Sequence, residues 1–275
     1  MPDTERGRRE RALDFSRPLE FVRTVVEANV ATVTFCRPPV NAVDMRAMSE
    51  IRTVFGEIGT HTDARVVIFT SAGAKSFCAG ADLKAFAGQQ DVDLASRIDE
   101  GLIARETFSA IRACPVPVIA AVNGPAIGAG MALAASCDII MADHTARFGA
   151  TEINVGLLGA VSYLRRLVGE YRARELFFTG ELVSADELLG RGSVTRLVEP
   201  EQLIDACKEL ARKIASKSPI GLRLAKDSIN RTEHLDLEQA YRVEQDYTAR
   251  LRRFNDSREA VTAFLEKRQP RWTLT

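Results

Sequence analysis

Short apolar runs alternate with amphipathic stretches over about the first 200 residues of the chain. Each apolar run is bounded by turn residues and predicts a strand. The predicted strands cover residues 20–26, 30–35, 65–70, 116–122 and 138–142. The amphipathic stretches predict helices over 44–58, 98–113 and 131–136, the first of them capped by Asp44. Strands that alternate with helices favour an α/β fold with a largely parallel sheet.

The pattern changes near Pro200, after which almost all of the chain has helical periodicity. The helices predicted there cover residues 201–217, 220–231, 235–253 and 257–268. We therefore divide the chain into a flexible N-terminal arm over 1–18, a core over 19–200 and a helical region over 201–275. Within the core, the polar stretch 85–99 is expected to form a mobile loop beside the functional site.

The composition argues against several classes of function. Of the 275 residues, 46% are hydrophobic, which is enough for a substantial core, and the formal net charge is +0. A neutral chain carries no electrostatic footprint for nucleic acid or for an acidic membrane surface. No apolar run is long enough to cross a bilayer, and the polar opening segment lacks the apolar centre of a secretory signal. We expect a cytoplasmic protein.

The cysteines and histidines give weak chemical signals. The five cysteines form no CxxC pair, and most lie in apolar contexts, as expected of reduced thiols in a core. Cys78 lies in a glycine-containing turn, so a nucleophile is considered there, but no histidine is near it in the sequence. His61, His144 and His234 show no metal-ligand spacing, and we expect no metal.

Two glycine-containing turns carry the strongest chemical signal. Residues 123–130 (NGPAIGAG) join an apolar run to a helix of small residues, and residues 75–84 (KSFCAGADLK) form a similar segment upstream. A helix start leaves backbone N–H groups without partners, and glycine permits close approach to the backbone. Two such turns predict two amide donors that converge on one oxygen, as in an oxyanion hole. The alternative is that both turns are only tight connections between a strand and a helix.

Further segments extend this pattern and point to a family. They are PVNA at 39–42, FCAGADL at 77–83, PVIAAVNG at 117–124, GAG at 128–130, CDI at 137–139, ARFG at 146–149 followed by Glu152 and Gly156, FTG at 178–180 and FLEKR at 264–268. With these motifs the chain resembles the enoyl-CoA hydratase/isomerase (crotonase) superfamily over about residues 20–270.

The resemblance implies a spiral core of stacked ββα turns, followed by C-terminal helices that assemble homotrimers, which often pair into hexamers. It implies an acyl-CoA thioester as substrate, a place in fatty acid metabolism, and no cofactor, since coenzyme A is part of the substrate. By position in the motifs, the backbone N–H groups of Ala81 and Ala129 would be the oxyanion donors, and Glu152 would be the catalytic acid/base.

The resemblance also assigns residues to coenzyme A. They are Val40, Ala42, Ala79, Asp82, Leu83 and Lys84, with Phe264 and Lys267 from a neighbouring subunit. Asp82 is expected chiefly to cap a helix, and Asp138 to have a structural role. Tyr163 and Ser162 lie in a segment that departs from the family pattern, where they either pack or add a polar group to the acyl pocket.

One family position is changed in a way that matters for the chemistry. The best-known hydratases of the family use two glutamates, and the first of these positions is Ala132 here. Hydration divides its proton transfers between two carboxylates, whereas a single carboxylate suits a proton shuttle between two carbons. A lyase or an isomerase, a decarboxylase or a hydrolase all stay open, as does a non-catalytic acyl-CoA-binding or protein-interaction role. A serine or cysteine protease is disfavoured, because no Ser/His or Cys/His pair is evident.

Overall fold

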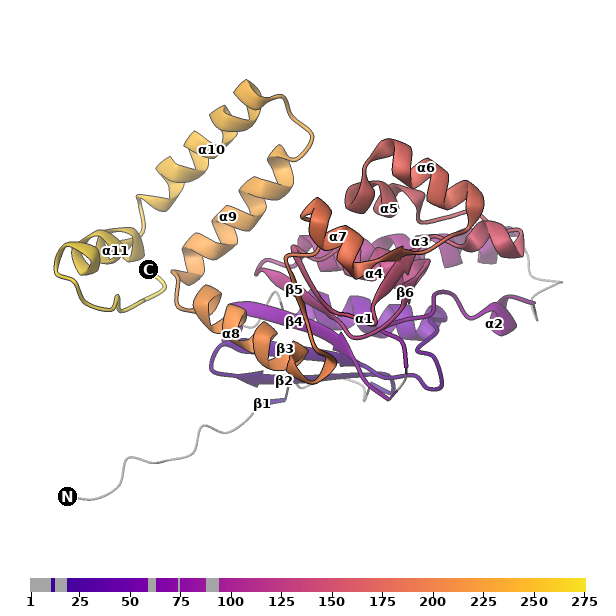
Figure 1. The fold of residues 1–275 in the computed structure, drawn as a ribbon. Coiled ribbons are helices and arrows are strands. Elements are labelled where there is room, and N and C mark those ends of the chain that lie inside the picture. Colours follow the sequence, from indigo (N-terminus) through magenta and orange to yellow (C-terminus); the bar gives the residue numbers. More distant parts are fainter. Residues whose placement is uncertain (1–10, 13–18, 59–62, 74, 88–93) are drawn as a thin grey trace, which may run out of the picture.

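A seven-stranded sheet lies at the centre of the computed structural model, which describes residues 11–12, 19–58, 63–73, 75–87 and 94–275 (Figure 1). Its strands, in spatial order, are β1 (Arg11–Ala12), β2 (Val22–Glu27), β3 (Val30–Phe35), β4 (Val66–Ser71), β5 (Val118–Val122), β7 (Ile139–Asp143) and β10 (Arg196–Val198). The pairs β1–β2 and β2–β3 are antiparallel, and every other pair in this sheet is parallel. The sequence therefore predicted the fold class and the direction of most strands.

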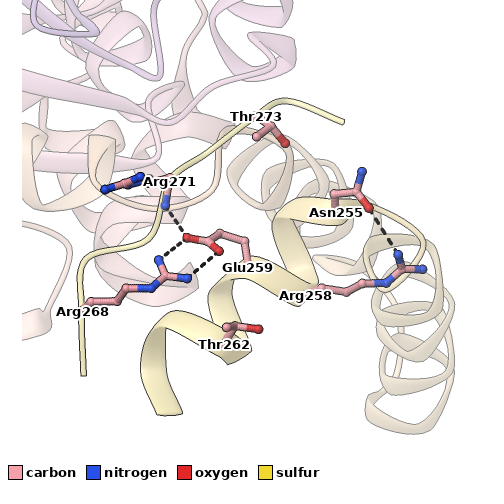
Figure 2. Close-up of a pocket in the computed structure, with 7 residues that line it drawn as sticks. All are labelled: Asn255, Arg258, Glu259, Thr262, Arg268, Arg271 and Thr273. Atoms are coloured by element: carbon pink, nitrogen blue, oxygen red, sulfur yellow. Dashed lines mark hydrogen bonds and ion pairs between the residues drawn. The ribbon is translucent and has the colours of Figure 1, made fainter. Parts of the chain in front are cut away.

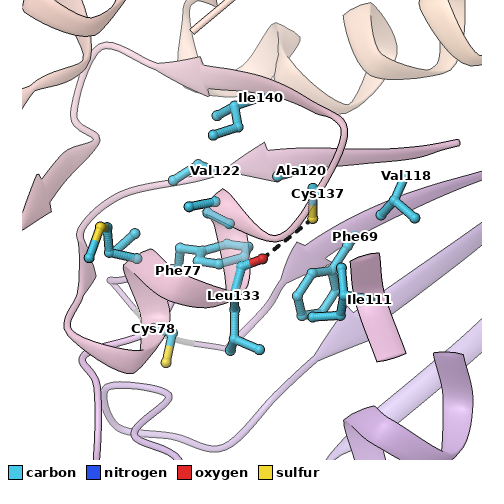
Figure 3. Packing of buried hydrophobic residues seen from close by; sticks show 14 of the residues in the cluster. Phe69, Phe77, Cys78, Ile111, Val118, Ala120, Val122, Leu133, Cys137 and Ile140 are labelled. Carbon is cyan, nitrogen blue, oxygen red and sulfur yellow. Dashed lines mark hydrogen bonds between the residues drawn. The ribbon is translucent and has the colours of Figure 1, made fainter. Parts of the chain in front are cut away.

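The central strands are buried on both faces. On β4, Val67 and Phe69 belong to one buried cluster, whereas Val66 and Ile68 belong to another on the opposite face. This arrangement explains why β4 reads as an unbroken apolar run rather than as an alternating one. On the first face, the ring of Phe69 makes edge-to-face contacts with the rings of Phe55 and Phe77. Figure 3 shows Phe69 and Phe77 within this cluster.

Helices cover the two faces of the sheet. On one face, α1 (Met45–Ile58) packs against α3 (Leu94–Ala113), and Asp44 caps α1 by accepting the N–H of Ala47 at 2.8 Å. On the other face, α8 (Leu203–Ala215) contributes its apolar side to the second cluster. A smaller sheet joins β6 (Ala126–Ile127), β8 (Arg147–Gly149) and β9 (Val183–Ser184).

The remaining helices surround this core or extend from it. They are α2 (Leu83–Ala87), α4 (Ala129–Ala135), α5 (Val161–Val168), α6 (Glu170–Thr179), α7 (Ala185–Arg191), α9 (Pro219–Thr232), α10 (Leu237–Leu251) and α11 (Asn255–Leu265), with short 3-10 turns at Glu152–Val155 and Pro200–Gln202. Figure 1 shows α9, α10 and α11 extending away from the sheet, at the opposite end of the molecule from α2.

The last residues of the chain fold back over α11. Asp256 is fully buried and accepts the backbone N–H of Thr273 at 2.8 Å, and the indole N–H of Trp272 donates to the carbonyl of Ser216. A cleft of about 650 Å³ lies between α11 and this segment, and Figure 2 shows Glu259 in it, paired with Arg268. These contacts fix α11 to the junction of α8 and α9.

Two expectations about the core need correction. The polar stretch 85–99 is not one loop: α2 occupies Leu83–Ala87 and α3 already begins at Leu94, while residues 88–93 lie outside the described part of the chain. The helix after the second glycine turn begins at Ala129, two residues before the predicted start, because small side chains at 129 and 130 are compatible with a close-packed first turn.

The N-terminal arm is described only in part. Arg11 and Ala12 pair with β2, and the rest of residues 1–18 lies outside the described residues. Within the residues that the structure describes, no helix has both the length and the apolar character needed to span a membrane.

Candidate active site

The two glycine turns predicted from sequence lie side by side. Cys78 and Ala126 form a parallel bridge, in which the N–H of Ile127 donates to the Cys78 carbonyl at 2.9 Å. The N–H of Cys78 donates in turn to the carbonyl of Pro125 at 3.2 Å. Segments that lie about 50 residues apart in the sequence are thus joined backbone to backbone, as this pairing requires.

Glycine is required at this junction because the backbones are too close for side chains. A Cβ on Gly80, whose φ is +95°, would lie 2.9 Å from the Ile127 carbonyl oxygen and 3.9 Å from the Ala129 nitrogen. A Cβ on Gly130 would collide with the carbonyl oxygen of Cys78. These contacts place the backbone before Ala81 directly beside the first residue of α4.

The local geometry leaves both expected donors without backbone partners. Val43 pairs with the segment around Ala81 through the Gly80 carbonyl (2.8 Å) and the Asp82 N–H (2.9 Å), so the Ala81 N–H is directed away from Val43. Ala129 is the first residue of α4, where an N–H has no acceptor within the helix. Among the described residues, neither of these two N–H groups donates to another backbone group.

Glu152 lies next to the start of α4. It begins the 3-10 turn Glu152–Val155, and a Cβ on Gly128 would lie 2.8 Å from its Oε1 atom. Its Oε2 atom is buried and has no hydrogen-bond partner within the described part of the chain. Burial raises the pKa of Glu152, because removal from water disfavours the charged form, and a hydrogen bond with its own backbone offsets this effect only in part. A carboxyl group with these properties is suited to accept and return a proton.

The position of the first family glutamate offers no such group. Ala132 is fully buried in α4, and its N–H donates to the Gly128 carbonyl at 3.0 Å. Its methyl side chain can neither accept nor deliver a proton. Of the two positions at which the best-known hydratases of the family have glutamates, 152 is therefore the one that holds a carboxylate in this chain.

The structure argues against Cys78 as a nucleophile. Its side chain is fully buried, in the same cluster as Phe77 and Leu133 (Figure 3). Burial raises the pKa of the Cys78 thiol to about 12, so the thiolate that a nucleophile requires is disfavoured.

Asp82 caps α2, as the sequence predicted. Its Oδ1 atom accepts the N–H groups of Lys84 (3.1 Å) and Ala85 (3.4 Å). Its Oδ2 atom accepts a hydrogen bond from Arg37 at 2.9 Å, and this contact holds the pKa of Asp82 below its usual range. Sequence reasoning missed Arg37, because 45 residues separate it from Asp82.

The structure brings together only some of the residues assigned to coenzyme A. Ala79 donates its N–H to the carbonyl of Val40 at 3.1 Å, so the segments 39–42 and 77–84 are neighbours. Val40 and Leu83 expose 46% and 45% of their surface, which leaves them accessible to a ligand. Phe264 belongs to α11 and Lys267 follows that helix, at the end of the molecule opposite α2 (Figure 1). Neither of these two residues lies beside the turns of its own chain.

Two other polar residues have packing roles. The Asp138 carboxylate accepts hydrogen bonds from the ammonium group of the buried Lys226 and from the N–H of Val118, both at 2.7 Å. These contacts agree with its expected structural role. The ring of Tyr163 packs edge to face on Phe108, with the ring centroids 5.2 Å apart, whereas Ser162 is exposed.

Comparisons with known proteins agree with this architecture. Residues 25–274 match the family model described as enoyl-CoA hydratase/isomerase. The chain is 38% identical to a short-chain-enoyl-CoA hydratase of Clostridium acetobutylicum, over 88% of this chain and 94% of that protein. It is 36% identical to a Rhodococcus jostii protein named (7aS)-7a-methyl-1,5-dioxo-2,3,5,6,7,7a-hexahydro-1H-indene-carboxyl-CoA hydrolase, over 88% of this chain and 93% of that protein.

Solved structures give the same result for the fold. An enoyl-CoA hydratase from Bacillus anthracis superposes with a TM-score of 0.86 at 33% identity, covering 92% of this chain and 99% of that one. The chain therefore belongs to the enoyl-CoA hydratase/isomerase family, and it is an enzyme of the crotonase fold. The resemblance inferred from the motifs is confirmed.

The close approach of the two turns gives a prediction for stability. Gly130→Ala is expected to lower the free energy of unfolding by about 1–3 kcal/mol, because its Cβ meets backbone that has little freedom to move. Gly56→Ala is the matched control: this residue is exposed in α1 and a Cβ there meets nothing within 4 Å, so alanine should stabilise by about 0.5–1 kcal/mol. Urea unfolding of both variants measures the difference. Equal effects at the two positions would contradict the packing described.

The raised pKa of Glu152 gives a prediction for the pH dependence of stability. The folded state binds the Glu152 proton more tightly than the unfolded state. The contribution of Glu152 to the free energy of unfolding is therefore most favourable at low pH, and it falls as pH rises through the pKa of the folded state. Glu152→Gln lacks this dependence. The stability of the variant relative to wild type should therefore increase from about pH 4 to neutral pH. Thermal unfolding across this interval tests the sign, and a relative stability that falls with pH would contradict the burial effect.

Proposed function

We propose that this enzyme forms an enolate of an acyl-CoA thioester in an oxyanion hole made by the N–H groups of Ala81 and Ala129, with Glu152 as its one catalytic acid/base. The observation that carries the proposal is the juxtaposition of the two turns with a buried carboxyl oxygen that lacks a hydrogen-bond partner among the described residues. The family's hydratases supply the class of substrate.

The chemistry follows from the charge that must develop. The Glu152 carboxylate removes a proton from the carbon next to the thioester, and the electron pair of the broken C–H bond moves onto the thioester oxygen. Two preorganised amide donors stabilise that oxygen as it becomes negative, and the loss of one such donor costs roughly 3–4 kcal/mol in comparable sites. The protonated Glu152 then returns its proton to a carbon of the same acyl chain.

A single carboxylate favours reactions in which one proton moves between two positions. Shifting a 3,4 double bond into conjugation needs only removal and return of a proton, whereas hydration also needs a water to be activated. With Ala132 at the first glutamate position, we propose isomerisation or an atypical hydration as the reaction. The raised pKa of Glu152 fits this role, since it makes the carboxylate a stronger base toward the proton that it removes.

A second candidate function is hydrolysis of a cyclic acyl-CoA. Two relatives at 36% identity, from Rhodococcus jostii and Mycobacterium tuberculosis, are named carboxyl-CoA hydrolases. One carboxylate can remove a proton from a water as it attacks the thioester carbonyl carbon, while amide donors hold the resulting oxyanion; collapse of that intermediate then breaks the C–S bond, and coenzyme A leaves as the thiol with the proton returned by the carboxyl group. Release of a carboxylate product from such a substrate would favour this candidate.

Coenzyme A recognition and assembly complete the proposal. We assign the pantetheine and nucleotide contacts to Val40, Ala42, Ala79, Leu83 and Lys84, with the backbone of Asp82, because the Asp82 carboxylate is engaged in the α2 cap and with Arg37. Phe264 and Lys267 would reach the site of a neighbouring subunit in a homotrimer or hexamer. The 81% exposure of Phe264 supports a contact outside its own chain.

Product analysis tests the proposed reaction. The protein is incubated separately with crotonyl-CoA and 3-hexenoyl-CoA, and the products are followed by mass spectrometry and by absorbance of the conjugated thioester. Conjugation of 3-hexenoyl-CoA without added water is expected, and Glu152→Gln should reduce its rate by about 10²–10⁴-fold, the usual contribution of a general acid/base. The affinity of that variant for acyl-CoA should stay within a few fold. Full activity of Glu152→Gln would overturn the assignment.

Restoring the second carboxylate gives an independent prediction. Ala132→Glu should raise the rate of crotonyl-CoA hydration, because a second acid/base would share the proton transfers to and from water. Ala134→Glu is the matched control: it places the same side chain at another fully buried position of α4 that the family motif does not use. An unchanged hydration rate in a folded Ala132→Glu variant would show that the shape of the pocket limits hydration.

A further inference from the structure

Arg37 connects two helix starts that border the proposed oxyanion hole. Its Nη2 atom lies 2.9 Å from the carboxylate of Asp44, which caps α1, and 2.9 Å from the carboxylate of Asp82, which caps α2. Its Nη1 atom donates to the carbonyl of Ala42 at 2.9 Å. The guanidinium group also lies over the ring of Phe21, 5.4 Å from its centroid. One side chain therefore fixes α1, α2 and the 39–42 segment relative to one another.

These contacts lie next to the expected donor. Asp82 follows Ala81 directly, and its N–H completes the bridge to Val43, which precedes Asp44. A shift of the Asp82 carboxylate moves the peptide that carries the Ala81 N–H, because only the backbone of one residue separates them. The contacts that the described residues make with the Arg37 side chain are with Asp44, Asp82, Ala42 and Phe21, and none of these is a proposed donor or acid/base. Any effect of Arg37 on the Ala81 N–H therefore has to pass through Asp82.

Arg37 also neutralises the charges of two neighbouring carboxylates. Both carboxylates lie within 2.9 Å of one nitrogen, so without the guanidinium group two negative charges would be left close together. Like charges at such a distance repel, and solvent screens this repulsion only in part, because the three side chains have exposed fractions of 21–25%. Loss of Arg37 would thus drive Asp82 and its turn away from α1.

We infer that Arg37 is a positioning residue for catalysis. Through its ion pair with Asp82, it orients the Ala81 N–H toward the thioester oxygen. The inference rests on the proposed function, because it assumes an acyl-CoA carbonyl in the hole. The planar guanidinium group suits this role, since it donates hydrogen bonds to two carboxylates and a carbonyl at once. The compact ammonium group of a lysine matches this geometry less well. Arg37→Lys should accordingly restore only part of what Arg37→Met removes.

The chain offers a matched control. Arg46 also lies over the Phe21 ring, at 5.6 Å from its centroid, and also makes two ion pairs, with Glu20 and Glu50. Within the described part of the chain, no ion pair or hydrogen bond joins Arg46 to Asp82. Arg46→Met therefore removes a similar set of interactions from the same region while leaving the Ala81 turn alone.

The test measures how strongly the proposed oxyanion hole polarises the carbonyl of a bound acyl-CoA. Butyryl-CoA labelled with ¹³C at the thioester carbonyl is bound to wild type, Arg37→Met, Arg37→Lys and Arg46→Met, and difference infrared spectroscopy records the carbonyl stretch. Wild type and Arg46→Met should show the same shift to lower wavenumber, Arg37→Met less than half of it, and Arg37→Lys an intermediate value. For turnover of 3-hexenoyl-CoA, Arg37→Met should lower kcat by about 10–10²-fold, the range expected of a misplaced catalytic group, with KM within a few fold.

A second-site variant tests the path through Asp82. Asp82→Asn keeps a side chain that caps helices but removes the repulsion with Asp44. The double variant Arg37→Met/Asp82→Asn should therefore show a larger carbonyl shift than Arg37→Met alone. If Arg37→Met does not fold, Arg37→Lys and the pair Arg37→Lys/Asp82→Asn make the same comparison.

The outcomes separate the inference from the proposed function. A normal carbonyl shift and normal kcat in Arg37→Met, with only a lower melting temperature, would overturn the positioning role and leave the oxyanion hole in place. The absence of any shift in wild type with bound butyryl-CoA would overturn both. If Arg46→Met reduces the carbonyl shift as much as Arg37→Met does, the effect comes from general packing in this region and not from the Asp82 ion pair. That result would overturn the inference.

Discussion

The close approach of two backbone turns is the constraint on which the rest of this site depends. Gly80 and Gly130 are needed because any side chain there would strike the facing backbone, and the bridge between Cys78 and Ala126 holds the two turns in register. An amide donor is useful for catalysis only when it is already aimed at the place where charge develops. The apolar cluster around Phe77 and Leu133 supports this alignment, because close-packed interiors resist displacement.

Burial of the carboxyl group follows from the same geometry. Glu152 meets the start of α4 at Gly128, where the absence of a side chain makes room for its carboxylate. A buried oxygen without a partner is costly in a folded protein, so its presence calls for a functional reason. A raised pKa is the direct consequence of that cost, and it makes the Glu152 carboxylate a stronger base than an exposed glutamate. The alanine at 132 leaves this single group to carry the proposed reaction.

The sequence predicted the fold and the family because its signals were local and mutually consistent. The alternation of apolar runs and helices gave the parallel sheet, and β3 was placed at its observed bounds. The motifs around Ala81 and Ala129 placed the turns that the structure joins. Arg37 was missed because its partners are distant in the sequence and an arginine beside two prolines gives no pattern. The start of α3 was missed because Leu94 and the three residues after it follow a polar stretch and are too few to show a helical stripe, and tertiary contacts decide such a boundary.

The most direct test of the central claim is exchange of the α-protons of a saturated acyl-CoA with solvent. Butyryl-CoA is incubated with the protein in D₂O, and deuterium incorporation is followed by mass spectrometry alongside an independent measurement of binding. The account predicts that wild type exchanges the α-protons without forming a product, and that Glu152→Gln binds butyryl-CoA but exchanges it about 10²-fold more slowly or less. Binding by wild type without exchange, or equal exchange by both proteins, would contradict enolate formation by Glu152.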